Sequence, residues 1–289
     1  MTWKSPRPSF AAVLMLALYS VSCSDSGGPP PVRTGTPAYY FQNAKDAYAK
    51  SDFRKTLDWL DKITNANPNE FTGRAWAFKL LLESGLIAGY KELAENYEYG
   101  QRNNKANPTP FIKKLTEYRG AATRMTLPFG EHYAEFGKAV TGGEAVIDFP
   151  FPAAGSTTRP AQLSAIAQGL APTEDAAGQA LKAMLARGVM LAICEAVGAK
   201  EDAAKARAAL QTPPLKIPRG ALEMVLAKTL FESAQLHGRK YSGNPVVQEF
   251  LSKHSLQALA LVSDLGKEGK ELKAKVEKEL KDAEAARKK

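Results

Sequence analysis

A six-residue phrase occurs twice in this chain and limits the folds that are open to it. The pattern Ala-Asn-Pro-x-x-Phe stands at residues 66–71 as ANPNEF and again, after a shift of 40 residues, at residues 106–111 as ANPTPF. An Asn-Pro pair ends a helix, because proline disfavours helical backbone in the residue before it. Repeats of about 20 to 50 residues are typical of stacked helical hairpins, since one hairpin cannot bury its apolar face alone. The repeat therefore predicts an all-α fold of antiparallel helical hairpins.

The first hairpin resembles a tetratricopeptide repeat. Aromatic, small and proline residues occupy the positions that this family uses, and they are Tyr40, Ala44, Ala47, Phe53, Leu60 and Pro68. Small residues let two antiparallel helices approach closely, and aromatic side chains fill the space between successive hairpins. The resemblance implies a TPR-like solenoid over residues 37–140, although the later units depart from the family's period of about 34 residues.

Amphipathic patterns continue to the C-terminus. The predicted helices cover residues 111–125 and 129–140 as a pair, and then 173–197, 203–210, 219–237 and 245–265. Residues 161–265 thus form a C-terminal helical part. The last segment, residues 266–289, alternates charge and keeps only a thin apolar stripe, which predicts a charged terminal helix or tail. A docking helix for a partner, or a coiled coil, is the alternative for this segment.

The N-terminal 22 residues have the three-part order of a secretion signal. Lys4 and Arg7 open the segment, an apolar stretch runs over residues 10–19, and small residues follow at 20–22. The apolar stretch holds about ten residues, whereas a helix that spans a bilayer needs roughly 20. We therefore interpret residues 1–22 as a signal peptide and predict no permanent transmembrane anchor.

The end of this signal, SVSC at residues 20–23, resembles the lipobox of bacterial lipoproteins. That resemblance implies that Cys23 is the lipid attachment site and the new N-terminus, and several acyl chains on one cysteine make a durable anchor. Ser20 stands where the family usually has leucine. Ser24, in place of aspartate, favours sorting to the outer membrane. The alternative is an ordinary cleaved signal followed by a chance cysteine.

The composition and net charge of the chain limit the kinds of molecule that it is expected to bind. Residues 23–36 are rich in glycine and proline and predict a flexible tether. The whole chain has a formal charge of +9, and loss of Lys4 and Arg7 with the signal leaves 37 basic and 30 acidic residues, or +7. The envelope location that the resemblance implies argues against nucleic acid, while a basic surface favours anionic headgroups or acidic polymers. Cys194 lies in an apolar run and is predicted to be a buried free thiol.

One long irregular loop interrupts the helices. Residues 141–160 combine prolines and glycines with strand-like apolar residues. Loops longer than about 12 to 15 residues are usually functional or disordered, and this apolar content argues against disorder. In one hypothesis Ile147, Phe149 and Phe151 contact a partner across a groove of the helical stack, with Asp148 providing polar selectivity. In the other, the loop is a connector packed on the core.

Residues able to carry catalysis are sparse. Glu131, His132 and Glu135 are spaced so that carboxylates and an imidazole can meet on one helix, as an acid/base or metal cluster requires. Their order does not match the His-Glu-x-x-His motif of zinc peptidases, and paired glutamates on a helix are usually solvated. His237 precedes a glycine at a predicted helix end, and His254 lies on an apolar stripe, so both are interpreted as structural.

Together these patterns predict a non-enzymatic adaptor or assembly factor of the bacterial envelope. We expect it to face the periplasm from a lipid anchor on Cys23, at the outer rather than the inner membrane, with an envelope protein or peptide as its partner. No catalytic residue, metal site or cofactor beyond the covalent lipid is predicted. The alternatives are an envelope hydrolase or metal-dependent enzyme that uses Glu131, His132 and Glu135, and a ligand-binding accessory protein of a transporter.

Overall fold

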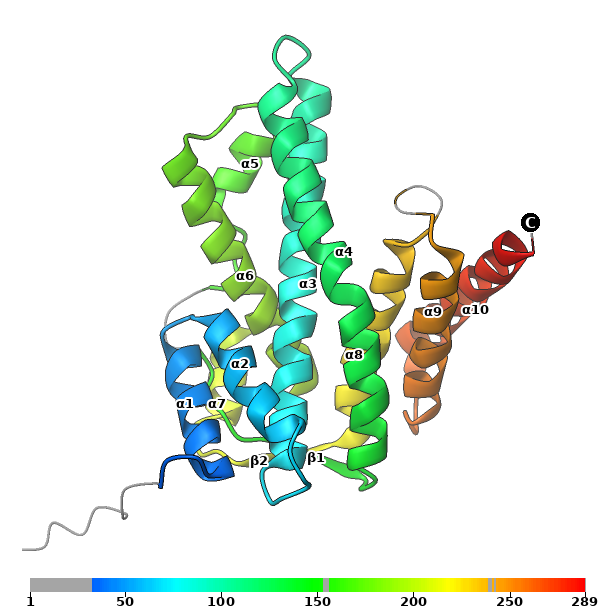
Figure 1. The fold of residues 1–289 in the computed structure, drawn as a ribbon. Coiled ribbons are helices and arrows are strands. Elements are labelled where there is room, and N and C mark those ends of the chain that lie inside the picture. The colour runs from blue at the N-terminus through cyan, green and yellow to red at the C-terminus, as the bar shows by residue number, and fades with distance from the viewer. Residues whose placement is uncertain (1–32, 153–155, 239–240, 242, 289) are drawn as a thin grey trace, which may run out of the picture. The chain divides into compact units, whose positions relative to one another are not determined.

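The computed structural model describes residues 33–152, 156–238, 241 and 243–288. The predicted signal peptide, Cys23 and residues 24–32 of the tether lie outside these described residues. Residues Arg33–Lys289 cluster as one compact unit. Its elements in chain order are α1 (Pro37–Ala49), α2 (Phe53–Thr64), α3 (Thr72–Asn103), α4 (Thr109–Ala139), β1 (Glu144–Ile147), α5 (Ala161–Ala167), α6 (Glu174–Ala196), α7 (Ala203–Ala209), β2 (Leu215–Pro218), α8 (Arg219–Gln235), α9 (Pro245–Ala260) and α10 (Gly266–Arg287) (Figure 1). The predicted all-α class is confirmed.

Both copies of the repeated phrase lie at turns between helices, as predicted. The first copy separates α2 from α3, and its Phe71 directly precedes the first residue of α3. The second begins after α3 and runs into the first turn of α4, where its Phe111 is fully buried. Each phrase thus marks a turn that ends one helix and starts the buried face of the next.

The α1–α2 hairpin has the local features that the sequence predicts for it. The Thr36 side chain caps α1 by accepting a hydrogen bond from the backbone N–H of Tyr39, and Asp52 caps α2 in the same way. Ala44 is fully buried where the two helices approach, as is Leu60 of α2. Small residues at such a position permit close packing of two helices. This is the feature of the tetratricopeptide-like pattern that the hairpin has.

Helix α3 lies at the centre of the unit and packs against α2, α4, α5, α6 and α8 (Figure 1). Every residue from 75 to 87 is buried, and a helix that is buried on all sides needs neighbours on all sides. In a solenoid each unit contacts only its neighbours along the chain. Contacts of α3 with α6 and α8 are therefore a different arrangement, and the TPR-like solenoid is not confirmed.

Helix α4 corrects the prediction of two helices at 111–125 and 129–140. It is one helix of 31 residues with Pro128 inside it. An internal proline removes one backbone hydrogen bond and usually breaks or kinks a helix. Here Phe111 and Tyr118 before the proline, and Phe129 and Phe136 after it, are all buried. Burial of both halves outweighs the local preference of proline for a break.

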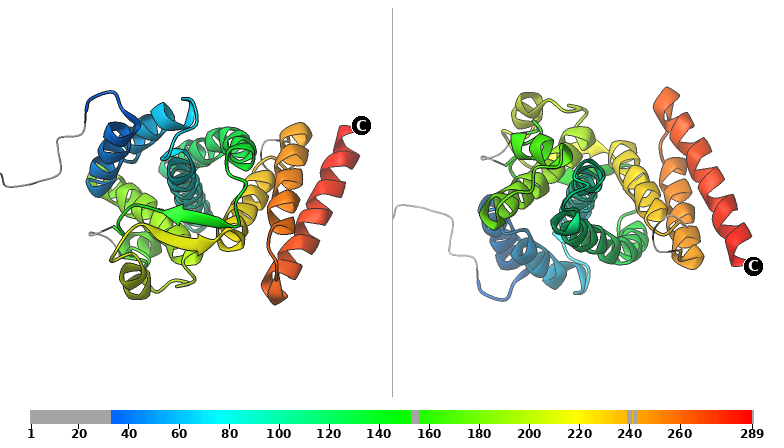
Figure 2. Two further views of the ribbon diagram at one scale, coloured as in Figure 1. Left: turned by 90° about the horizontal axis from the view of Figure 1, so that it is seen from below. Right: turned by 90° about the horizontal axis from the view of Figure 1, so that it is seen from above.

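Part of the predicted irregular loop 141–160 is a strand. Strand β1 pairs antiparallel with β2, with Ala145 opposite Ile217, and the two strands cross the end of the helical unit (Figure 2). The sequence around β2 predicts only a break between helices. Such a pair is invisible locally, because each strand is four residues long and its partner lies about 70 residues away.

The C-terminal elements form a layer in which α9 lies between α8 and α10 (Figure 2). The charged terminal segment is a helix rather than a tail, and its Val276 and Ala283 are fully buried. An ion pair of 3.0 Å between Arg287 and Glu249 joins α10 to α9. The thin apolar stripe is thus sufficient to hold α10 on its own chain.

Two glycines allow α3 and α6 to touch, and they yield a test of the packing. A Cβ atom added at Gly188 would lie 2.1 Å from the carbonyl oxygen of Gly85. We expect Gly188→Ala to lower the free energy of unfolding by about 1–3 kcal/mol in urea denaturation, because backbone must move. A Cβ atom added at Gly178, on the same helix, would meet nothing within 4 Å. Gly178→Ala is therefore expected to raise the free energy of unfolding by up to about 1 kcal/mol. Equal effects of the two substitutions would contradict this packing.

Candidate binding groove

An open cavity of 620 Å³ lies between α3 and α4 on one side and the α8–α10 layer on the other. We call it the central groove. Its lining residues come from five helices and the α8–α9 connection, and they are Lys91, Ala94, Glu95, Arg119, Ala122, Gln235, Leu236, Gly238, Tyr241, Gln248, Glu279, Asp282, Ala285 and Ala286. Its volume is within the range of about 300–1,000 Å³ that is common for ligand sites.

Two further cavities continue the central groove. A cavity of 830 Å³ along α4 shares Arg119 and Tyr241 with it. A third cavity, of 370 Å³, shares Lys91 and Glu95. The second cavity thus adjoins the central groove on α4 and the third adjoins it on α3, so the surface is suited to an extended segment of chain as well as to a compact molecule.

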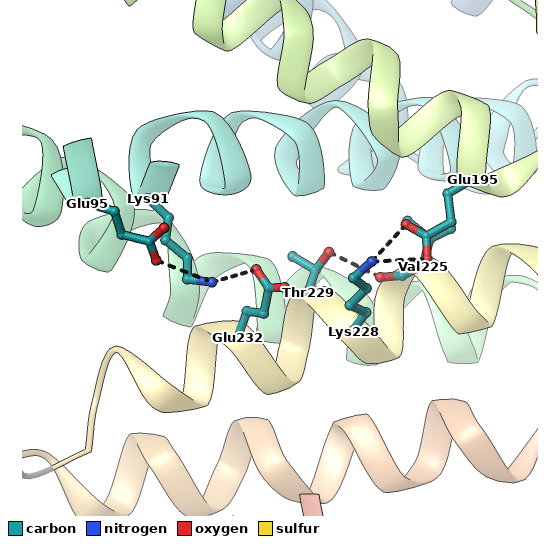
Figure 3. Close-up of polar contacts among 7 residues, drawn as sticks. All are labelled: Lys91, Glu95, Glu195, Val225, Lys228, Thr229 and Glu232. Atoms are coloured by element: carbon teal, nitrogen blue, oxygen red, sulfur yellow. Dashed lines mark hydrogen bonds and ion pairs between the residues drawn. The ribbon is translucent and has the colours of Figure 1, made fainter. Parts of the chain in front are cut away.

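Charged contacts tie α8 to α3 and to α6 (Figure 3). The Lys91 ammonium lies 3.2 Å from Glu232 and 3.8 Å from Glu95. Burial lowers the pKa of Lys91, but the two carboxylates outweigh this, so its pKa is raised above the ordinary value and the ammonium persists at neutral pH. Farther along α8, Lys228 pairs with Glu195 of α6 at 3.4 Å. These pairs hold α8 in place as one wall.

Arg119 of α4 stands where the first two cavities meet. Its Nη2 donates to Oε2 of Glu98 at 2.8 Å, which ties the guanidinium to α3. The same guanidinium lies over the Tyr241 ring, 4.8 Å from its centroid, as a cation–π contact. The charge of Arg119 is thus already paired within the protein, and its planar face helps to shape the groove.

The α10 side of the groove is acidic. Residues 279, 282 and 286 share one face of the helix, next to the buried stripe that packs on α9. Gln248 donates a hydrogen bond of 2.6 Å to Glu279. In the described part of the chain, neither Glu279 nor Asp282 has a basic partner within ion-pair distance. With Lys91 and Arg119 paired to carboxylates of their own, these two charges give the groove a negative potential.

The central groove offers charged and amide side chains. None of its described lining residues is a histidine, cysteine or serine. The described residues also contain no group of three or more histidines, cysteines, aspartates or glutamates arranged to hold a metal ion. The carboxylates of the lining, and the side-chain amides of Gln235 and Gln248, can recognise a molecule by charge and by hydrogen bonds.

The predicted cluster of Glu131, His132 and Glu135 is not brought together. Glu131 and Glu135 are exposed, and Glu135 pairs with Lys138 at 2.6 Å. His132 turns instead toward α3, where its Nδ1 lies 2.9 Å from Oε1 of Glu83. The correction has a simple cause, because α4 packs its inner face on α3 while residues 131 and 135 face solvent.

His132 belongs to a chain of ionic contacts across α2, α3 and α4. The buried Lys79 Nζ lies 3.0 Å from Nε2 of His132 and 2.6 Å from Oδ1 of Asp61. An ammonium can only donate, so Nε2 accepts and the ring proton lies on Nδ1, facing Glu83. Both ring nitrogens are therefore engaged, and Lys79 occupies the space beside Nε2. The sequence signal for this network was the pair Lys79 and Glu83, two charged residues four apart in a largely apolar run.

The structure favours the connector hypothesis for the 141–160 loop over partner contact. Its four residues, Ile147, Asp148, Phe149 and Phe151, are buried in the protein's own core. The Phe149 ring stacks on Phe78 of α3 with centroids 3.8 Å apart, and the Asp148 carboxylate pairs with Lys45 at 2.9 Å and Arg74 at 3.0 Å. Burial of the apolar side chains and pairing of the aspartate make this segment a connector packed on the core.

Cys194 lies in α6, and both the cysteine and much of this helix are buried. Cys194 is fully buried, as predicted, and burial raises the pKa of its thiol to about 11. Among the described helices, α6 has the length and apolar composition of a membrane span, but half of that stretch is buried in the unit, largely against α3. Cys23 lies outside the described residues.

Comparison of the chain with models of protein families, with curated proteins and with solved structures finds no match. The groove is therefore interpreted from its own residues. Sequence reasoning missed them, because Lys91, Arg119 and the Glu279–Asp282 pair lie on three different helices, α3, α4 and α10, and only the packing of these helices brings them to one site.

Proposed function

We propose that this protein is a non-enzymatic adaptor of the bacterial envelope that holds a basic peptide segment of an envelope protein in the central groove. The supporting observation is that Glu279 and Asp282 line the open central groove without a basic partner within ion-pair distance among the described residues, while its two lining cations, Lys91 and Arg119, are paired with other carboxylates. A groove with carboxylates along one wall attracts lysine and arginine side chains and repels acidic segments.

The shape of the surface supports a peptide as occupant. The central groove adjoins two more cavities along α3 and α4, so an extended segment can occupy them in turn. Gln235 and Gln248 offer side-chain amides to the polar groups of a peptide backbone. Leu127, exposed in the second cavity, and Leu236 offer apolar contact between the polar groups.

In the proposal, the tether holds this groove near a membrane surface. In the proposal, lipid on Cys23 anchors the chain, most favourably at the outer membrane, and the glycine- and proline-rich residues 24–36 let the helical unit reach a partner in the periplasm. Cys23→Ala is expected to release the protein from sedimented envelopes into the soluble fraction. An unchanged membrane fraction would contradict the lipid anchor.

Site-directed crosslinking in native envelopes tests the groove. A photoreactive residue at Ala285, inside the groove, is expected to capture one predominant protein, which mass spectrometry identifies together with the crosslinked peptide. The same residue at Lys281, outside the groove, is the positional control. The captured peptide is expected to carry a net positive charge.

Charge reversal separates recognition from folding. Glu279→Lys with Asp282→Lys is expected to reduce capture at Ala285 by at least about tenfold, because like charges meet in the groove. Glu271→Lys with Glu277→Lys makes the same change in net charge on an exposed part of α10 and is expected to leave capture within about twofold. Equal loss in both variants, or capture of an acidic peptide, would overturn the proposal.

A further inference from the structure

The 830 Å³ cavity that adjoins the central groove carries the opposite charge, and we call it the α4 cavity. Two arginines line it, Arg119 and Arg124, whereas none of its described lining residues is an aspartate or a glutamate. The lining of the central groove, by contrast, includes the carboxylates of Glu279 and Asp282. A segment that lies across both spaces therefore meets a negative surface in one and a positive surface in the other.

Arg124 is the available cation of the α4 cavity. Its side chain is exposed, and it has no ion pair or hydrogen bond within the described residues. A Cβ atom added at Gly120, one turn earlier on α4, would lie 3.2 Å from Nη1 of Arg124. The glycine thus leaves room for the guanidinium to lie back along the helix. Arg119 is already paired with Glu98 at 2.8 Å, so a bound carboxylate has Arg124 as its counter-charge.

The histidine of this cavity does not add a second available charge. His237 is 7% exposed, and its Nε2 lies 2.7 Å from the hydroxyl oxygen of Thr126. Burial lowers the pKa of His237, so the ring is mostly neutral at pH 7. The positive potential of the α4 cavity therefore comes from arginine, which stays charged throughout the physiological range of pH.

Apolar side chains surround Arg124 in this cavity. They belong to Leu115, Leu127, Pro128 and Val247, and Leu127 is 38% exposed. Covering such apolar surface with a partner is favourable. The α4 cavity thus combines the Arg124 guanidinium with an apolar surface, which is the complement of a carboxylate flanked by apolar side chains.

We propose that the peptide segment held by the central groove also carries one acidic residue between apolar residues, and that this part of the segment lies in the α4 cavity. The carboxylate pairs with Arg124, and the apolar side chains pack against Leu127 and Val247. Arg119 and Tyr241 line both spaces, so the basic and acidic parts of the segment adjoin there. Opposite charges in adjoining spaces fix the register of the bound segment. This inference rests on the proposed function and adds a second recognition element to it.

Fluorescence anisotropy of short peptides with the purified full-length protein tests the inference. The probes have the sequence KKGLDL and the reverse order LDLGKK, so that both chain directions are covered, with capped ends and a neutral fluorophore. In at least one order, asparagine in place of aspartate is expected to weaken binding about three- to tenfold, because an arginine–carboxylate pair is lost. Asparagine also makes the probe more basic, so attraction to the acidic groove alone predicts the opposite result.

Variants on α4 assign this preference to Arg124. Arg124→Gln is expected to abolish the preference for aspartate over asparagine while leaving binding of the asparagine probe within about twofold. Lys113→Gln makes the same change of charge on an exposed part of α4 outside both spaces and is expected to keep the preference. Both side chains are exposed, so both variants are expected to retain the native melting temperature.

Three results contradict the inference: equal binding of the aspartate and asparagine probes, binding of neither, or an unchanged preference in Arg124→Gln. The proposed function fails by a different result, which is capture at Ala285 that does not respond to Glu279→Lys with Asp282→Lys. If this double substitution abolishes capture while the two probes bind equally well, the basic segment is held as proposed and only the acidic part of the inference is wrong.

Discussion

Replacing Glu223 by alanine is expected to lower the free energy of unfolding by about 3–5 kcal/mol. Glu223 is fully buried in α8. Tyr133 of α4 donates its hydroxyl to Oε2 at 3.0 Å, and Arg219 donates Nε–H to Oε1 at 2.8 Å. Burial raises the pKa of Glu223, and the hydrogen bonds and charge of its two partners offset this in part. Without the carboxylate, the largely buried Arg219 guanidinium has lost its counter-charge.

Urea denaturation followed by circular dichroism at neutral pH measures this loss. Glu195→Ala is the matched control, because Glu195 also pairs across helices, with Lys228, but both side chains are partly exposed. Its expected cost is at most about 1 kcal/mol. Tyr133→Phe removes one hydrogen bond and is expected to cost about 1 kcal/mol. If Glu223→Ala were no more costly than Glu195→Ala, the buried network would not hold α8 to α4.

Phe149→Ala is expected to cost about 3–5 kcal/mol of unfolding free energy. The ring is 1% exposed, stacks on Phe78 and meets Tyr48 edge-on at 5.6 Å between centroids. Truncation leaves a cavity between α1, α3 and the segment after β1, which the surrounding helices can fill only in part. Thermal and urea denaturation both measure the effect.

The exposed aromatic residue Tyr99 supplies the comparison for Phe149. Tyr99 is 54% exposed, and Tyr99→Ala is expected to cost less than about 1 kcal/mol. The pair of variants also decides between the two hypotheses for the 141–160 loop. Unchanged stability in Phe149→Ala, together with loss of a bound partner, would favour partner contact over the buried connector.

Local signals in the sequence were reliable where structure depends on neighbours along the chain. The N-terminal cap at Thr173, followed by two acids, predicts the start of α6 at the right residue, since its side chain accepts from the backbone of Ala176. Both Asn-Pro phrases predict helix ends for the same reason. Where two distant segments had to meet, the same signals failed. Pro128 predicts a break that burial of α4 on α3 overrides. Strand-like residues mark the segment of β1, but no local signal shows that it pairs with β2.

The candidate site residues also show that local sequence signals do not reveal contacts between distant segments. The sequence places Glu131, His132 and Glu135 on one helix, but which face of that helix meets α3 depends on packing over its whole length. His132 therefore contacts Glu83 and Lys79, which lie about 50 residues away in the sequence. The acidic wall of the central groove likewise exists only because α10 docks on α9 and brings Glu279 to the groove.

By itself, the sequence determined that this chain is helical, where the helices α6 to α9 begin, and that Cys194 is buried. These properties follow from backbone preferences and from apolar periodicity, which act over a few residues. Only the tertiary structure decided that α3 is surrounded rather than stacked, that Ile147, Asp148, Phe149 and Phe151 are buried in the core, and where the grooves lie. The reason is that burial and ion pairing are energies between residues far apart in the chain, and they are realised only when the helices pack.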